Sequence, residues 1–398
     1  MRHTLFLALI CPIALFAQTI RIPHLSELSL DEKIGQLIMI AAISAPDLNE
    51  AFCKEMPYHL DPSYTEQMIC TYHVGGVLFL GAGTPQQQSA VTQRLQSLSK
   101  YPLLIGLDAE WGLSMRHVKD VVPFPRAGAL GMLSPEHDHM IYELGFEIGR
   151  ECTALGVHIN FAPVADVNSN PENPVINTRS FGDSPDLVSH KAELYMRGIQ
   201  AAGILSCAKH FPGHGDTAFD SHYTFGTVPH SKKRLKKIEL PPFAHLISNG
   251  VDAVMIAHLA VPALAESKST PATTSHKIIT GLLREKLQFQ GLIITDGLGM
   301  RGITDLYDSA QIAVKALLAG VDLLLCPIDV PVAIEGIKNA LKEGILSESE
   351  LDCHVKRILK AKRSTIKKPT PAYQQSAIIS QKALQLQASL SAQKTPRE

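Results

Sequence analysis

Short runs of hydrophobic residues recur along the chain, and amphipathic segments separate them. Eight of these runs carry few charged residues until their carboxyl-terminal ends. Continuous apolar runs of this length are typical of strands that are buried on both faces of a parallel sheet. The sequence therefore predicts eight strands, over residues 35–40, 74–80, 102–108, 157–165, 204–208, 253–258, 292–296 and 321–326.

The segments between these runs predict helices. Over 134–155 apolar residues recur at helical spacing after a Ser-Pro pair, which suits a cap and first turn. Segments 309–319 and 347–361 show the same pattern, and Gly320 is a typical helix-stop glycine. Strands and helices therefore alternate along most of the chain.

This alternation predicts an α/β fold, specifically a (β/α)8 TIM-type barrel. We expect one catalytic domain over 18–365 and a short C-terminal tail over 366–398, with a short helix near 376–390 that either docks or belongs to a mobile tail. A partly ordered tail is the favoured interpretation. The alternative fold is a doubly wound open sheet, which the missing G-x-G-x-x-G after the first strand disfavours.

The amino terminus resembles an export signal. Arg2 precedes an apolar run over 5–16, and Ala17 offers a small residue before a cut. We therefore expect a signal peptide over 1–17 and an exported protein, periplasmic or associated with the cell envelope. An uncleaved membrane anchor is the alternative, although the run is short for a span.

Charge and cysteine content narrow the function further. The 398 residues include 37 Lys and Arg against 38 Asp and Glu, so no basic excess exists to neutralise nucleic-acid phosphates. None of the seven Cys falls in a C-x-x-C spacing, which disfavours zinc and redox sites. Cys53 and Cys70 flank a loop and could pair after export. We expect no nucleic-acid partner and a monomer.

Ionisable residues gather where the predicted strands end. The stretch 209–222 is the densest, with three His, two Asp and one Lys in a largely loop-forming sequence. The carboxyl ends of barrel strands meet at one face, where active sites are built. Five strands contribute to this candidate site, through Asp108 and Glu110, Asp166 and Arg179, Lys209, His210, Asp220 and His222, His258, and Asp296.

At these residues the chain resembles glycoside hydrolase family 3, in its β-N-acetylglucosaminidase branch. Residues 209–222 match the K-H-F-P-G-H-G-D-T-x-x-D-S-H pattern of that branch throughout. The resemblance covers roughly 27–362. Further motifs follow in family order, at Leu30 to Gln36, Gly75 to Val77, Arg179 to Gly182 and Ile294 to Met300.

The resemblance implies a retaining mechanism with named roles. Asp296 would be the nucleophile, and His222 the acid/base that Asp220 orients. Terminal sugar hydroxyls would be bound by Asp108, Arg179, Lys209 and His210, while His258 is equally well placed as a hydrogen-bond donor behind the site. The implied substrate is a terminal β-linked N-acetylglucosamine, on peptidoglycan muropeptides or chitooligosaccharides. No cofactor and no metal are implied.

Two departures from the family pattern concern fine substrate preference. Where the family often has D-Q-E-G-G, this chain has Asp108-Ala109-Glu110-Trp111-Gly112, and Gly297 stands where a second acid often follows the nucleophile. Within the family, phosphorolysis and β-glucosidase activity are alternatives.

Two more distant alternatives stay open. A metal-dependent amidohydrolase would use residues such as His210, His258 and Asp296, but the first predicted strand lacks its H-x-H pair. A non-catalytic sugar-binding protein would have no need of Asp220, His222 and Asp296 together.

Overall fold

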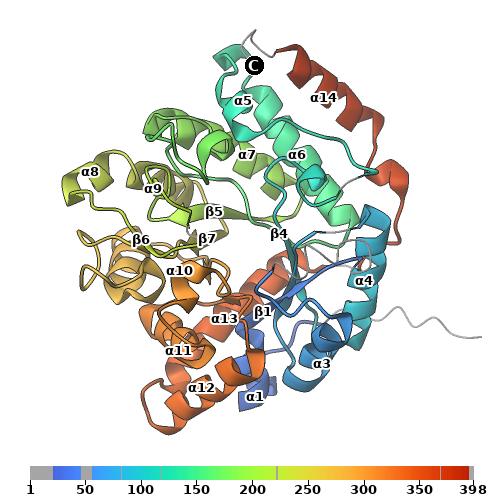
Figure 1. Ribbon diagram of the computed structural model, residues 1–398. Helices are drawn as coiled ribbons and strands as arrows, with labels where there is room; N and C mark the ends of the chain where they lie inside the picture. The colour runs from blue at the N-terminus through green and yellow to red at the C-terminus, as the bar shows by residue number, and fades with distance from the viewer. Residues whose placement is uncertain are drawn as a thin grey trace, which may run out of the picture.

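Eight parallel strands close into a barrel at the centre of the molecule (Figure 1). The computed structural model describes residues 21–45, 56–81, 83–117, 119–220, 223–367 and 369–393. The strand order is β10-β1-β2-β3-β4-β5-β7-β9, and a parallel bridge between Ile294 and Leu323 joins its two ends. The predicted (β/α)8 fold is therefore confirmed. The strands are β1 Ile38–Ala42, β2 Gly76–Phe79, β3 Leu104–Leu107, β4 Ile159–Asn160, β5 Leu205–Phe211, β7 Ala253–Ile256, β9 Leu292–Thr295 and β10 Leu324–Leu325.

The barrel interior is a packed core. Every residue of the eight strands is buried, which explains why the apolar runs are continuous and not alternating. A Cβ on Gly106 would stand 3.0 Å from the Phe161 ring and 3.3 Å from the Met39 sulfur. Side chains therefore fill the space inside the strands, as in other barrels of this size. A short second sheet pairs β6 Gly226–Thr227 with β8 Leu259–Ala260 beside it.

Helices cover the outside of the barrel (Figure 1). Several begin with reciprocal caps: Ser29 accepts from the Glu32 N–H while Glu32 accepts from the Ser29 N–H, and Ser347 pairs with Glu350 in the same way. The helices are α1 Leu30–Gln36, α3 Pro62–Tyr72, α4 Pro85–Leu98, α5 Ala127–Gly131, α6 His139–Ala154, α7 Pro185–Ala201, α8 Lys232–Lys237, α9 Leu240–Ser248, a π-helix Lys277–Lys286, α10 Arg301–Thr304, α11 Ser309–Ala319, α12 Val330–Lys342, α13 Glu348–Thr365 and α14 Gln381–Ala392.

Several predicted boundaries were wrong, most of all at β4, which spans Ile159–Asn160 and not 157–165. The first strand begins at Ile38 and not at 35, because the Ser29 cap starts a helix that runs through Gln36. The helix expected from 134 opens with a separate 3-10 turn, Pro135–His137, before α6 begins. Strand β5 extends to Phe211, three residues beyond the expected end, so the Lys and His at 209 and 210 are strand residues.

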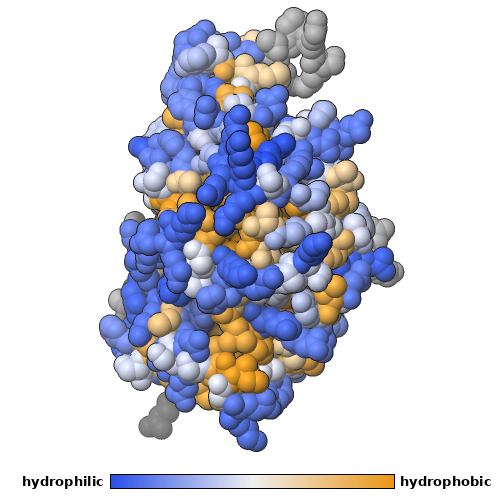
Figure 2. Space-filling view, turned by 90° about the vertical axis from the view of Figure 1, so that its left-hand side faces the viewer, coloured by the Kyte–Doolittle hydropathy of each residue, from blue (hydrophilic) through white to orange (hydrophobic). Residues whose placement is uncertain are grey.

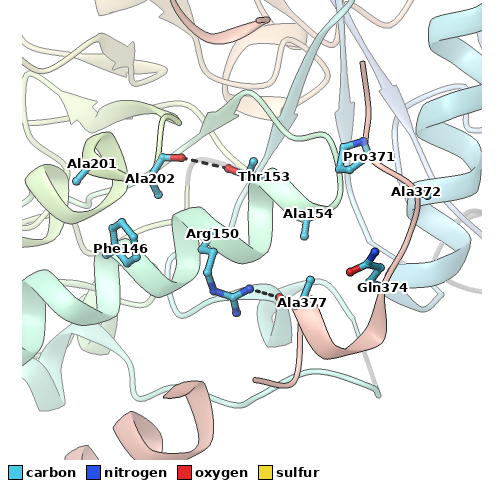
Figure 3. Close-up of a pocket in the computed structure, with 10 residues that line it drawn as sticks. All are labelled: Phe146, Arg150, Thr153, Ala154, Ala201, Ala202, Pro371, Ala372, Gln374 and Ala377. Carbon is cyan, nitrogen blue, oxygen red and sulfur yellow. Dashed lines mark hydrogen bonds between the residues drawn. The ribbon is translucent and has the colours of Figure 1, made fainter. Parts of the chain in front are cut away.

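The C-terminal segment packs against the barrel. Helix α14 buries Ala383, Leu386 and Leu390, and Ser380 both caps it and donates to Glu147 on α6 at 2.8 Å. Arg150 of α6 donates to the Ala377 carbonyl (Figure 3). The docked alternative therefore describes 381–392 better than a mobile tail. A cavity of about 490 Å³ lies between α6, the end of α7 and this segment, away from the carboxyl ends of the strands.

Other sequence predictions fall partly outside these residues. The expected signal peptide 1–17, Cys53 and His222 are not among the described residues, and Cys70 is an exposed free thiol. No helix in the described part of the chain is long and apolar enough to cross a membrane. Hydrophilic side chains predominate on the face in Figure 2, with hydrophobic patches between them.

Candidate active site

Two acids and three bases from neighbouring strand ends form one network. The Lys209 ammonium lies 2.8 Å from Asp108 Oδ1 and 2.7 Å from Glu110 Oε1. Arg179 donates two parallel bonds to Glu110, from Nε at 3.0 Å and Nη2 at 2.7 Å. Arg116 donates to the second oxygen of Asp108. The carboxyl ends of β3 and β5 and the loop after β4 therefore converge, as the sequence predicted for Asp108, Arg179 and Lys209.

The charges of this network are fixed by its own members. Burial alone would raise the pKa of Asp108, but Lys209 and Arg116 lower it to about 2. Arg179 and Lys209 likewise overcome burial and hold the pKa of Glu110 far below its usual value. Burial would lower the pKa of Lys209, yet the two carboxylates raise it. Both acids therefore stay ionised, and Lys209 and Arg179 stay charged across the physiological pH range.

Asp166 anchors the start of the 209–222 loop. It is fully buried and accepts from the backbone N–H groups of His210 (3.1 Å) and His214 (2.7 Å). The His210 ring donates to it from Nδ1 at 2.7 Å, which leaves Nε2 to accept from Arg179 at 3.4 Å. His210 therefore joins the network as predicted, and its tautomer follows from these two partners.

His214 shapes this loop from inside. It is 1% exposed, its Nδ1 lies 2.8 Å from the Thr217 hydroxyl, and its carbonyl accepts from Asn173 at 2.8 Å. Burial lowers the pKa of His214 to about 4. A neutral, enclosed imidazole of this kind holds the loop in place and does not act as a cation.

A second set of contacts fastens the outer part of the loop. Asp216 pairs with His230, accepts from Ser169 at 2.9 Å and lies 3.8 Å from Arg234. Further on, the Asp220 carbonyl accepts from the backbone N–H groups of Tyr223 and Thr224, three and four residues later, both at 3.1 Å. Asp220 thus stands on a turn. Because His222 lies outside the described residues, the pairing of Asp220 with His222 stays a prediction.

Asp296 follows β9 and faces the same space as the network. Its N–H donates to the Ile256 carbonyl at 3.0 Å, and its Oδ1 accepts from the Gly297 N–H at 2.8 Å. The charges of Asp296 and Asp108 act together on three groups, and both raise the pKa of each: Tyr58, Cys207 and Cys326. The two carboxylates therefore lie near the same three groups, as expected from the strand ends.

His258 lies behind Asp296 and is fully buried. Its Nε2 donates to the Gly297 carbonyl at 3.1 Å, and its Nδ1 lies 2.7 Å from the Thr273 hydroxyl. Both ring nitrogens therefore have protein partners, and a bond to substrate would break one of them. Of the two roles considered for His258, positioning of the segment after Asp296 fits this geometry better than substrate binding.

Sequence reasoning missed Arg116 and placed Glu110 in the candidate site without a role. The two residues complete the charge balance around Lys209 and Asp108. The signal for Arg116 was weak, because it follows a turn after Trp111 and lies eight residues beyond Asp108. In the described part of the chain, no group of three or more His, Cys, Asp or Glu is arranged to hold a metal.

A barrel with this carboxyl-end chemistry matches a known class. Residues 29–361 match the model of the glycosyl hydrolase family 3 N terminal domain, so the chain belongs to glycosyl hydrolase family 3. The resemblance in the sequence is thereby confirmed.

Particular relatives support the same branch. Beta-hexosaminidase A of Pseudoalteromonas piscicida is 34% identical over 338 residues, covering 78% of this chain and 56% of that protein. Beta-hexosaminidase LpqI of Mycobacterium tuberculosis is 31% identical, covering 86% of this chain and 84% of its own length. The solved family 3 β-N-acetylglucosaminidase from Paenibacillus sp. is 35% identical with a TM-score of 0.81, covering 92% of this chain and 69% of that one. The chain thus spans little more than half of the Pseudoalteromonas protein.

Proposed function

We propose that this chain is a retaining glycoside hydrolase that removes terminal β-linked N-acetylglucosamine. The observation that carries the proposal is the convergence of Asp296 with the Asp108–Lys209–Arg179 network at one end of the barrel. The hexosaminidase and N-acetylglucosaminidase names of its relatives support the choice of sugar. A fixed set of charges beside one further carboxylate suits a sugar whose hydroxyls must be oriented over a nucleophile.

The network supplies the contacts that a terminal sugar needs. The Lys209 ammonium has three donors, and its contacts to Asp108 and Glu110 use two of them. Its third donor and the ionised Asp108 would bind adjacent sugar hydroxyls by charge-assisted hydrogen bonds. Arg179 and His210 are held in place by hydrogen bonds to Glu110 and Asp166, and they would bind further hydroxyls of the same sugar. Because every member is held by another, the sugar would meet a preorganised surface.

The chemical steps follow from a nucleophile and an acid/base. Asp296 attacks the anomeric carbon, forming a carboxylate–C1 bond as the glycosidic C–O bond breaks, while His222 gives its proton to the leaving oxygen. Water then attacks C1 and releases Asp296, and its proton returns to His222. Asp220, two residues from His222, would orient the imidazole and favour its charged form. No metal and no cofactor take part in these steps.

We further propose that the substrate comes from the cell wall. The apolar amino-terminal run supports export, which would bring the enzyme to muropeptides that carry a terminal N-acetylglucosamine. Chitooligosaccharides present the same terminal sugar and are the second candidate substrate.

One assay tests the reaction class. The purified chain is given 4-nitrophenyl N-acetyl-β-glucosaminide beside 4-nitrophenyl β-glucoside, with and without inorganic phosphate, and the Asp296→Asn variant serves as control. We expect the first substrate to be hydrolysed to free N-acetylglucosamine by the native chain alone. A sugar 1-phosphate as the main product would replace hydrolysis with phosphorolysis. Faster turnover of the glucoside would overturn the sugar assignment.

A further inference from the structure

Tyr58, in the segment between β1 and α3, lies directly against the residues that follow Asp296. A Cβ built on Gly297 would stand 2.3 Å from the Tyr58 hydroxyl oxygen, and one on Gly299 would stand 2.4 Å from its Cε1. Real Cβ atoms essentially never approach other atoms so closely. The tyrosine ring and hydroxyl therefore occupy the space that side chains at these two glycine positions would fill.

Backbone conformation gives no other reason for these glycines. Neither Gly297 nor Gly299 has a positive φ, whereas Gly112, Gly213 and several other glycines of the chain do. A side chain would be compatible with the local backbone at both positions. The close approach of Tyr58 is what excludes it, and Gly297 is the position at which the chain departs from the family pattern.

The Tyr58 hydroxyl also lies in the electric field of the site. Burial raises its pKa, and the carboxylates of Asp296 and Asp108 raise it further, while the Gly299 N–H acts as a donor to the phenol oxygen and lowers it. Tyr58 therefore keeps its proton at every pH at which the enzyme would work. A neutral phenol that accepts from one N–H still has its own O–H to donate.

Asp296 has several titratable neighbours besides Tyr58. Cys207 on β5, Cys326 after β10 and His214 on the β5 loop all feel its charge. The two thiols are buried with raised pKa values, and His214 has a lowered one, so all three are neutral near pH 7. Among these neighbours Tyr58 alone offers a strong O–H donor to a carboxylate.

We propose that Tyr58 is a positioning residue for the nucleophile, whose hydroxyl occupies the space beside Gly297 and donates toward the Asp296 carboxylate. This inference rests on the proposed function, in which Asp296 attacks the sugar. His258, which binds the Gly297 carbonyl, follows β7, while Tyr58 comes from the segment between β1 and α3. The nucleophile segment is thus held by two separate elements of the barrel. A donor to the carboxylate stabilises its charged form and fixes which oxygen points at the anomeric carbon.

The first test removes only the hydroxyl. Tyr58→Phe should lower kcat at least tenfold with KM within about twofold, and should move the acidic limb of the kcat/KM profile to higher pH, because loss of a donor raises the pKa of the nucleophile. Tyr64→Phe is the matched control, since it removes a phenol from α3 near Val330 and Asp329, away from Asp296. It should leave rate and profile unchanged. An unmoved acidic limb in Tyr58→Phe would overturn the proposal.

The second test measures the contact itself. Gly297→Ala should lower both activity and the unfolding temperature of the native chain. In a Tyr58→Phe background the hydroxyl is gone, and the next ring atom, Cζ, is 3.5 Å from the new Cβ, an ordinary contact. The added alanine should then change the unfolding temperature little, so the two substitutions would be strongly non-additive. Additive losses would contradict the geometry.

These outcomes separate the inference from the proposed function. If Asp296→Asn keeps full activity, the nucleophile assignment fails, yet the non-additive unfolding temperatures would still report the contact. If Asp296→Asn is inactive while Tyr58→Phe behaves as the native chain, only the role of Tyr58 is lost.

Discussion

Two buried charge clusters lie at opposite ends of the barrel, and they differ in how completely their acids are satisfied. At the amino-terminal end, Asp322 precedes β10 and is fully buried. It accepts from Arg284, from Arg357 at 2.9 Å, from His354 at 3.0 Å and from the Ile293 N–H at 2.9 Å. Four donors from three segments, the π-helix, β9 and α13, saturate one carboxylate.

At the carboxyl-terminal end the arrangement is looser. Asp108 keeps 14% of its side-chain surface exposed while it pairs with Lys209 and Arg116. Here three cations pair with two carboxylates, and Lys209 has a third N–H donor beyond those that contact Asp108 and Glu110. Buried carboxylate–cation clusters therefore have different roles at the two ends of the barrel. The saturated Asp322 cluster holds strands and helices together, whereas the Asp108 cluster has groups left to bind a substrate.

Removing one carboxylate charge at each end of the barrel gives the largest expected difference between the two ends. Asp296→Asn should lower turnover by about 10⁴-fold or more, as loss of a nucleophile does, with an unchanged unfolding temperature. Asp322→Asn should instead lower the free energy of unfolding by about 3–5 kcal/mol, because buried cations lose their partner. Its activity for each folded molecule, measured at low temperature, should be native. Equal effects of the two substitutions on activity would remove the distinction.

At the carboxyl-terminal end of the barrel, the effect of removing the acid/base should depend on the leaving group of the substrate. His222→Ala should slow substrates with poor leaving groups by about 10²–10⁴-fold and activated aryl glycosides far less, because only the former need protonation. Activated substrates should show a burst, and azide should restore the second step. The assignment would fall if good and poor leaving groups suffered equally and azide had no effect.

Asp220→Ala tests the same acid/base assignment, with a smaller expected loss of activity. The imidazole remains but loses its orienting partner, so activity should fall less than in His222→Ala. The basic limb of the pH profile should move to lower pH, because a carboxylate near an imidazolium stabilises its charged form. A basic limb that stays in place would show that Asp220 and His222 do not interact.

A further prediction concerns Lys362, a buried residue of α13. It is 1% exposed and donates to Gln36 Oε1 at 2.6 Å, and burial lowers its pKa to about 7. The unfolded chain, with a pKa near 10.4, binds more protons between these values, so stability should rise with pH over that window, on the order of 2 kcal/mol between pH 7 and 9. Lys362→Met should flatten this rise in urea unfolding measured at several pH values. A native slope in the variant would refute the assignment.

The smallest expected effect is that of a chelator. Lys209, Arg116 and Arg179 balance the negative charges of Asp108 and Glu110 at the carboxyl-terminal end of the barrel. EDTA should therefore leave the turnover of an aryl N-acetyl-β-glucosaminide unchanged. Loss of activity that zinc restores would bring back the metal-dependent alternative.

The fold and the outline of the site could be predicted from the chain because both depend on local patterns. Apolar runs located the strands, and the position of Asp108, Lys209 and Asp296 at their ends located the active face. Boundaries were missed where a cap decided them, as at Ser29, since capping depends on single hydrogen bonds.

Contacts between distant segments could not be predicted in the same way. The Asp322 cluster joins Arg284, His354 and Arg357 across some thirty-odd residues on either side, and no local pattern links them. Tyr58 lies in the segment between β1 and α3 and carries no distinguishing motif. Its one trace in the sequence is the pair of glycines after Asp296, whose meaning depends on a ring that only the fold brings there.

Covalent trapping of the nucleophile tests the central claim most directly. The native chain is inactivated with a fluoroglycoside that forms a slowly hydrolysed glycosyl-enzyme, then digested, and the labelled peptide is sequenced by mass spectrometry. We predict one sugar per chain, esterified to Asp296, and no label in Asp296→Asn. A label on Asp108, Glu110 or any other residue, or full inactivation without a covalent sugar, would contradict the account.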